Sequence, residues 1–134
     1  MTGTTMSRTI LVIDDNPVNL KLAAEVLLAD GHAVLRAEDA EQALRLLERH
    51  MPDLVLTDIA LPKMDGLELT RRLKADPRYR HLPVIALTAS AMKGDEARVL
   101  EAGCDAYIAK PIDTRTLSAQ ILRLLSAAAG TANS

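Results

Sequence analysis

Short apolar runs alternate with longer amphipathic stretches along the whole chain. Between the runs, apolar residues recur every three or four positions, which is the helical period. The first amphipathic stretch begins at Asn16-Pro17, an N-cap residue followed by a residue suited to the first helical position, and it ends at Gly31. The runs predict five strands, each followed by a helix, at residues 8–13, 32–37, 54–57, 83–88 and 105–109.

Capping and breaking residues mark the other four predicted helices. Small and polar residues precede the first strand and follow position 126, so the pattern predicts one domain over residues 8–126, with flexible termini at 1–7 and 127–134. The second helix begins at Asp39, with Gln42 completing a capping-box-like start, and ends before Pro52, and the third follows Gly66 and ends before Asp76-Pro77. The fourth runs over about 92–102 and stops at Gly103. Asp113 caps the last helix, whose apolar stripe is Leu117, Ile121, Leu124 and Leu125.

The predicted strands indicate the type of sheet. Several are apolar throughout and do not alternate with polar residues, which is typical of strands buried on both faces of a parallel sheet. Strands that alternate with helices connect by right-handed crossovers, and five such units favour an open, doubly wound sheet. The sequence therefore predicts an α/β fold with helices on both faces of a five-stranded parallel sheet.

Composition excludes several classes of function. The 134 residues include 16 basic and 18 acidic side chains, for a net charge of −2, so no basic footprint for nucleic acid is expected. There is no Trp or Phe to stack on bases, and one cysteine cannot form an internal disulfide. The early apolar run at 10–13 is cut by Asp14 and Asp15, which argues against a signal peptide or membrane span. We expect a soluble, cytoplasmic protein.

Polar residues follow four of the five predicted strands. They are Asp14 and Asp15, Asp58, Thr88 and Lys110. Each alone fits a plain role as a cap, a loop residue, a strand end or a surface charge. The carboxyl ends of parallel strands share one edge, however, and three carboxylates together favour a hard cation such as Mg²⁺. One carboxylate could then attack phosphorus while the hydroxyl and ammonium groups bind the phosphoryl oxygens.

Four segments resemble the receiver domain of two-component response regulators. The resemblance covers about residues 8–126 and implies a flavodoxin-like sheet with strand order 2-1-3-4-5. Residues 15–19 also resemble receivers of hybrid histidine kinases and of some single-domain regulators. The four segments are Ile13-Asp14-Asp15-Asn16, 57–66 (TDIALPKMDG), Leu87-Thr88-Ala89 and 107–111 (YIAKP).

The resemblance implies a role for each residue near the acidic cluster. Asp58 would accept a phosphoryl group from a phosphohistidine on a histidine kinase or a histidine phosphotransfer protein. Asp15, Asp58 and the backbone carbonyl of Ala60 would bind Mg²⁺, and Asp14 would act through a bound water. Lys110 would contact the phosphoryl group.

The resemblance also implies a conformational switch. Thr88 would move toward the phosphoryl group, and Tyr107 would turn inward to fill the space. The Lys110-Pro111 peptide bond would be cis. The output would be a population shift at the face formed by the fourth helix, fifth strand and fifth helix, where a downstream protein would bind.

The resulting interpretation is a phosphorylation-dependent switch or phosphate shuttle without an output domain, and not an enzyme with a separate substrate. One alternative is a Mg²⁺-dependent phosphohydrolase that uses Asp58 as a transient nucleophile. Another is a degenerate receiver that acts only as a constitutive protein-binding module. No GxGxxG or GxxxxGK[ST] motif occurs, so the sequence does not support a dinucleotide or nucleoside triphosphate site.

Two further features lead to expectations. Met92, Glu96 and Leu100 share one face of the fourth helix, which fits either a partner-binding surface or an ordinary surface helix. Ala60 and Ser90 occupy family positions that influence loss of the phosphoryl group. Neither carries a carboxylate or amide that could orient an attacking water, so we expect a long-lived aspartyl phosphate.

Overall fold

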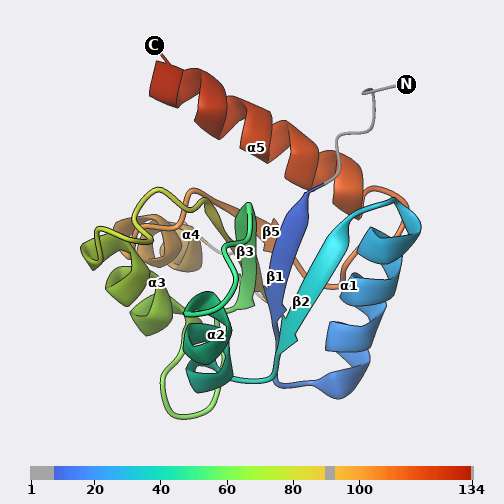
Figure 1. Ribbon diagram of the computed structural model, residues 1–134, viewed down its shortest axis with the longest axis horizontal. Coiled ribbons are helices and arrows are strands. Elements are labelled where there is room, and N and C mark those ends of the chain that lie inside the picture. Colours follow the sequence, from blue (N-terminus) through green and yellow to red (C-terminus); the bar gives the residue numbers. More distant parts are fainter. Residues whose placement is uncertain (1–7, 90–92, 134) are drawn as a thin grey trace.

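A computed structural model describes residues 8–89 and 93–133. Its centre is a parallel sheet of five strands in the order β2-β1-β3-β4-β5 (Figure 1). This order confirms the predicted doubly wound fold, in which the chain starts near the middle of the sheet and winds outward in both directions. The strands are β1 (Thr9–Ile13), β2 (Ala33–Ala37), β3 (Leu54–Asp58), β4 (Val84–Thr88) and β5 (Ala106–Ala109).

Helices cover both faces of the sheet. Helices α1 (Pro17–Ala29) and α5 (Leu117–Asn133) lie on one face, and α2 (Ala40–Leu47), α3 (Gly66–Ala75) and α4 (Lys93–Glu101) lie on the other (Figure 1). Successive side chains of a strand point to opposite faces, so β1 contributes to both cores. Leu11 and Ile13 pack with α2 and α3, whereas Ile10 and Val12 pack with α1 and α5.

Two predicted capping residues, Asn16 and Asp39, hold the starts of their helices, and Asp65 does the same for α3. The predicted cap Asp113 instead precedes a turn, and α5 begins at Leu117. The Asn16 side chain accepts hydrogen bonds from backbone N–H groups in the first turn of α1. Asp39 accepts one from the Gln42 N–H at 2.8 Å, and Asp65 accepts one from the Glu68 N–H at 2.8 Å. These bonds satisfy N–H groups that have no partner within their own helix.

Two helix ends differ from the prediction. Helix α2 ends at Leu47, before Pro52, because the following N–H groups of Glu48 and Arg49 bond three residues back and tighten the turn. Helix α5 continues to Asn133, whereas the pattern predicted a helix ending near residue 126. The three alanines at 127–129, which follow the apolar stripe, have high intrinsic helix propensity and favour this continuation.

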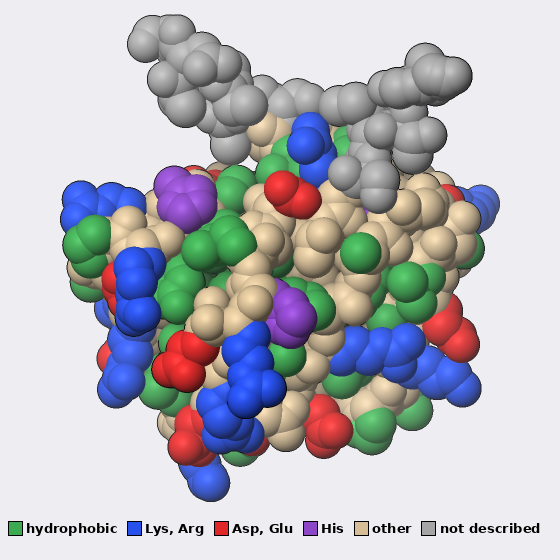
Figure 2. Space-filling view, viewed as in Figure 1, with side chains coloured by type: hydrophobic (Ala, Val, Ile, Leu, Met, Phe, Trp, Pro, Cys, Tyr) green, Lys and Arg blue, Asp and Glu red, His purple; other side chains and the backbone are tan. Residues whose placement is uncertain are grey.

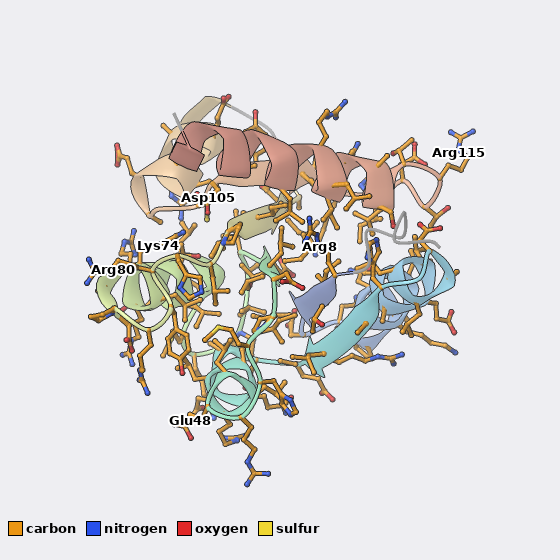
Figure 3. The ribbon with its side chains drawn as sticks, turned by 45° about the horizontal axis from the view of Figure 1, so that its top comes forward. Arg8, Glu48, Lys74, Arg80, Asp105 and Arg115 are labelled. Atoms are coloured by element: carbon orange, nitrogen blue, oxygen red, sulfur yellow. The ribbon has the colours of Figure 1, made fainter. Side chains whose placement is uncertain are left out.

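An ion pair at the edge opposite the predicted site ties β4 to β5. The Lys74 ammonium on α3 lies 3.0 Å from Asp105 Oδ2 and donates to the Leu82 carbonyl at 2.7 Å (Figure 3). The same Asp105 oxygen accepts the Val84 N–H at 2.8 Å. Because the starts of β4 and β5 are joined in this way, their carboxyl ends are held side by side at the opposite edge.

The surface over α2 and β2 carries both signs of charge. Figure 2 shows basic and acidic side chains interspersed on this face, with apolar side chains between them. In the described part of the chain, 8–89 and 93–133, no helix has the length and hydropathy of a transmembrane segment.

Candidate functional site

The structure brings together the three aspartates that follow β1 and end β3. Asp14 and Asp15 follow β1, and Asp58 is the last residue of β3, the neighbouring strand. One carboxylate oxygen from each of the three lies within 4.8 Å of the others. Asp14 and Asp58 are buried, whereas Asp15 is exposed to solvent. The acidic cluster, meaning these three residues, therefore has one open side.

Lys110, which follows β5, reaches into the acidic cluster. Its ammonium lies 2.9 Å from Asp58 Oδ2 and 3.2 Å from Asp14 Oδ2. The peptide bond between Lys110 and Pro111 is cis, as the resemblance implied. Since more than fifty residues separate each aspartate from the lysine along the chain, only the parallel sheet brings these groups into contact.

Backbone donors orient both buried carboxylates. Asp58 Oδ1 accepts the Ala60 N–H at 3.1 Å, while its other oxygen faces Lys110. Asp14 Oδ1 accepts the Asn16 N–H at 2.9 Å. Charge-assisted hydrogen bonds of this kind are stronger than neutral ones, so both carboxylates are held in a fixed direction.

Burial and neighbouring charges have opposite effects on the pKa values of Asp14 and Lys110. Burial raises the pKa of Asp14 above its usual value, although the bond from Asn16 and the charge of Lys110 oppose this. Burial works to lower the pKa of Lys110, but its bonds to Asp58 and Asp14 outweigh that effect and the pKa is raised. Lys110 is therefore charged at neutral pH.

The acidic cluster fits a hard divalent cation. All its ligand atoms are carboxylate oxygens, which Mg²⁺ prefers, and the exposed side at Asp15 leaves room for the waters that Mg²⁺ retains. A divalent ion would also relieve the repulsion among three carboxylates that share a single lysine.

Replacing Asp14 by asparagine tests this electrostatic description. A carboxylate with a raised pKa binds more protons when folded than when unfolded, so it lowers stability as the pH rises through that window. Without Mg²⁺, Asp14→Asn is expected to raise the free energy of unfolding at pH 7, because the amide carries no charge that burial penalises. The same variant should bind Mg²⁺ more weakly. In the native protein Mg²⁺ affinity should fall as the pH drops through the raised pKa of Asp14.

Urea denaturation and calorimetric titration with Mg²⁺, each over a pH series, measure both effects. A variant that is less stable than the native protein and binds Mg²⁺ equally well would contradict the description.

A hollow of about 160 Å³ lies beside Asp58 on the side of α4. Thr88, which is buried at the end of β4, and Ala60 both line it. So does Arg98 of α4, a residue that the sequence did not single out, since no strand end or motif marks it. The hollow is lined by Asp58, Ile59, Ala60, Leu67, Thr88, Ala89, Arg98 and Val99.

Tyr107 does not line this hollow. It lies on β5 and lines a separate hollow of about 280 Å³ together with Gln120 and Leu124 of α5. Its hydroxyl is hydrogen-bonded to Glu96 of α4. Partial burial is the larger cause of the raised pKa of Tyr107, and this hydrogen bond is the second cause. The Tyr107 hydroxyl is thus tied to α4.

Comparison with known families assigns the chain. The sequence pattern of the response regulator receiver domain matches residues 10–122, most of the chain. The chain belongs to this family. Receiver domains are two-component signalling proteins that interact with histidine kinases or phosphotransfer proteins, and they bind Mg²⁺ in an acidic pocket.

Individual relatives agree with the family. The receiver is 48% identical over 107 residues to the polar-differentiation response regulator DivK of Brucella ovis, covering 80% of this chain and 87% of that protein. It is 38% identical to the receiver domain of the sensor histidine kinase PA1611 of Pseudomonas aeruginosa, with a TM-score of 0.81 over 90% of this chain and 98% of that one. That structure has a magnesium ion coordinated in its active site cleft.

A more distant relative supports the fold alone. The chemotaxis response regulator CheY4 of Vibrio cholerae superposes with a TM-score of 0.84 at 22% identity, over 89% of this receiver and 99% of that chain. The five-stranded sheet with order 2-1-3-4-5 is therefore the fold that this receiver shares with CheY-like proteins.

Proposed function

We propose that this receiver accepts a phosphoryl group on Asp58 from a phosphohistidine of a histidine kinase or histidine phosphotransfer protein, in a reaction that requires Mg²⁺. The receiver then acts as a switch or passes the phosphoryl group onward. The observation that carries the proposal is the Asp58 carboxylate itself. It is oriented by Lys110 at 2.9 Å and by the Ala60 N–H at 3.1 Å, within a cluster of acidic ligands.

The transfer is a single exchange of bonds at phosphorus. A carboxylate oxygen of Asp58 forms a bond to phosphorus as the bond from phosphorus to the partner's imidazole nitrogen breaks, and the electron pair stays on that nitrogen. Lys110 lies where it can stabilise the negative charge of the phosphoryl oxygens during this exchange. Thr88, on the neighbouring strand, supplies a hydroxyl that can donate to one of them.

Mg²⁺, when bound, neutralises charge on the phosphoryl oxygens and allows the anionic carboxylate to approach phosphorus. Asp15, Asp58 and the backbone carbonyl of Ala60 would hold it, with Asp14 acting through a water. The fit of the acidic cluster to a hard cation supports this assignment.

The proposed output is the surface formed by α4, β5 and α5. Thr88 would move toward the phosphoryl group, and Tyr107 would leave Glu96 and turn inward, which shifts the population of this surface. Its exposed Leu100 and the hollow at Tyr107 offer apolar contacts for a downstream protein. Leu100 and Glu96 are exposed while Val99 faces the core; the predicted stripe's other member, Met92, is outside the described residues.

Phosphorylation with a small donor tests the proposal without knowledge of the partner. Incubation with acetyl phosphate and Mg²⁺ is expected to add one phosphoryl group, detected by intact mass, and chelation of Mg²⁺ should prevent the addition. A purified phosphorylated phosphotransfer protein should transfer its label in the same way. No labelling under any of these conditions would leave a constitutive binding module as the function, and rapid turnover of small phosphomonoesters would favour a phosphohydrolase.

The aspartyl phosphate is expected to persist for minutes or longer. Hydrolysis needs a water positioned in line with the bond between Asp58 and phosphorus, and the methyl group of Ala60 cannot orient one. Ser90, the second residue behind this expectation, lies outside the described residues. A phosphate-release assay on the purified phosphorylated receiver measures the lifetime, and complete loss within seconds would contradict the expectation. Ala60→Asn, which supplies an amide at this position, should shorten it.

A further inference from the structure

The hollow beside Asp58 is bounded on one side by α4. Most of its lining is apolar, and its polar groups are the Asp58 carboxylate, the Thr88 hydroxyl and the Arg98 guanidinium. Among the residues that the structure describes, Arg98 is the one basic residue that lines it. Lys110 contacts Asp58 but does not line this hollow, whereas Arg98 lines it together with Asp58.

Small side chains leave this space open. Ala60 and Ala89 carry only methyl groups, and both line the hollow. A long side chain at either position would fill the space between Asp58 and α4. With a volume of about 160 Å³, the hollow can hold a phosphoryl group attached to Asp58 with space left for a guanidinium group.

Arginine matches a phosphoryl group chemically. A phosphorylated side chain carries about two negative charges at neutral pH, and a guanidinium binds two of its oxygens at once through parallel N–H groups. Lys110 neutralises one charge at most. A second cation that shares the hollow with Asp58 can therefore neutralise charge that the phosphoryl group adds.

We propose that Arg98 binds the phosphoryl oxygens on phosphorylated Asp58 and thereby couples α4 to the phosphorylation state. The inference rests on the proposed function and adds to it a residue that binds the phosphoryl group. Arg98 is exposed at the mouth of the hollow, so its side chain can turn inward without unpacking the core. Its neighbour Val99 is buried and also lines the hollow, so a shift of Arg98 acts on the part of α4 that packs on the sheet.

The coupling reaches the proposed output surface through the same helix. Glu96 lies two residues before Arg98 and binds the Tyr107 hydroxyl. A movement of α4 toward the phosphoryl group changes the position of Glu96, which frees Tyr107. Arg98 thus gives α4 a direct response to phosphorylation, separate from any movement of Thr88.

Beryllofluoride, a phosphoryl mimic that binds aspartate together with Mg²⁺, tests the inference. Arg98→Gln is expected to weaken beryllofluoride binding about tenfold, measured by fluorine NMR, because one charge-assisted bidentate contact is lost. Arg98→Lys should recover part of the affinity. Arg80→Gln is the matched control, since Arg80 is exposed in the turn before β4, away from the carboxyl end of that strand (Figure 3). This control should bind as the native receiver does.

Two further measurements separate binding from folding. The affinity for Mg²⁺ alone should be equal in the native receiver and in Arg98→Gln, and the Arg98 side-chain N–H resonance of the native receiver should shift when beryllofluoride is added. Equal beryllofluoride affinity in Arg98→Gln, or an unmoved Arg98 resonance, would overturn the inference while leaving Asp58 as the acceptor. No beryllofluoride complex in the native receiver would overturn the proposed function and this inference with it.

Discussion

Asp58→Asn is expected to abolish phosphorylation by acetyl phosphate and by a phosphorylated partner. The amide of asparagine has no anionic oxygen to attack phosphorus, and losing a covalent nucleophile costs on the order of a thousandfold or more. The fold should survive, because Lys110 keeps its contact with Asp14 at 3.2 Å. Intact mass after incubation with acetyl phosphate, together with thermal unfolding, measures both outcomes.

Asp65→Asn is the matched control for this experiment. Asp65 belongs to the same loop between β3 and α3, but its carboxylate caps α3 and is absent from the acidic cluster. Asparagine is also a good capping residue, so stability should change little. Labelling that persists in Asp58→Asn and disappears in Asp65→Asn would show that the acceptor has been misassigned.

Gly66→Ala is expected to have the largest effect on stability. A Cβ at Gly66 would overlap the carbonyl oxygen of Asp58 and lie 3.0 Å from Ile59 Cα, both of them backbone atoms that cannot rotate away. The Gly66 N–H also donates to the Ile59 carbonyl at 2.8 Å, which holds α3 close to the end of β3. Overpacking against rigid backbone should cost about 3 kcal/mol and displace the loop that orients Asp58.

Gly31→Ala provides the comparison. Nothing lies within 4 Å of a Cβ at Gly31, but its φ of +93° is unfavourable for alanine, so a loss of roughly 1 kcal/mol is expected. Urea denaturation of both variants compares the cost of steric overlap in Gly66→Ala with the cost of backbone strain in Gly31→Ala. If Gly66→Ala were as stable as Gly31→Ala, and still phosphorylated at the native rate, the close approach of Gly66 to Asp58 would have no structural role.

The sequence alone predicted most of the fold because its local signals agree with one another. Asn16 and Asp39 cap their helices as expected, and the uniformly apolar strands form a parallel sheet covered on both sides. Helix ends were predicted less well, because apolar periodicity does not report their causes. The tightened turn after Leu47 depends on backbone hydrogen bonds, and the continuation of α5 to Asn133 depends on helix propensity.

The acidic cluster could be predicted because topology constrains it. In a parallel sheet every strand ends at the same edge, so residues that follow different strands must converge even when they are far apart in sequence. This rule alone places Asp14, Asp58 and Lys110 at one edge of the sheet. The rule does not give the geometry of each contact, such as the position of the Lys110 ammonium between the carboxylates of Asp58 and Asp14.

Only the tertiary structure decided which residues surround Asp58 on its open side. Arg98 lies within a helix, where no strand end or turn marks a residue as functional, and its place in the hollow that Asp58 lines depends on how α4 packs against the sheet. The same holds for Tyr107, whose place on β5 follows from the sequence but whose hydrogen bond to Glu96 depends on the position of α4. Sequence patterns report periodicity along one element, whereas contacts between elements depend on the shapes of all the side chains packed between them.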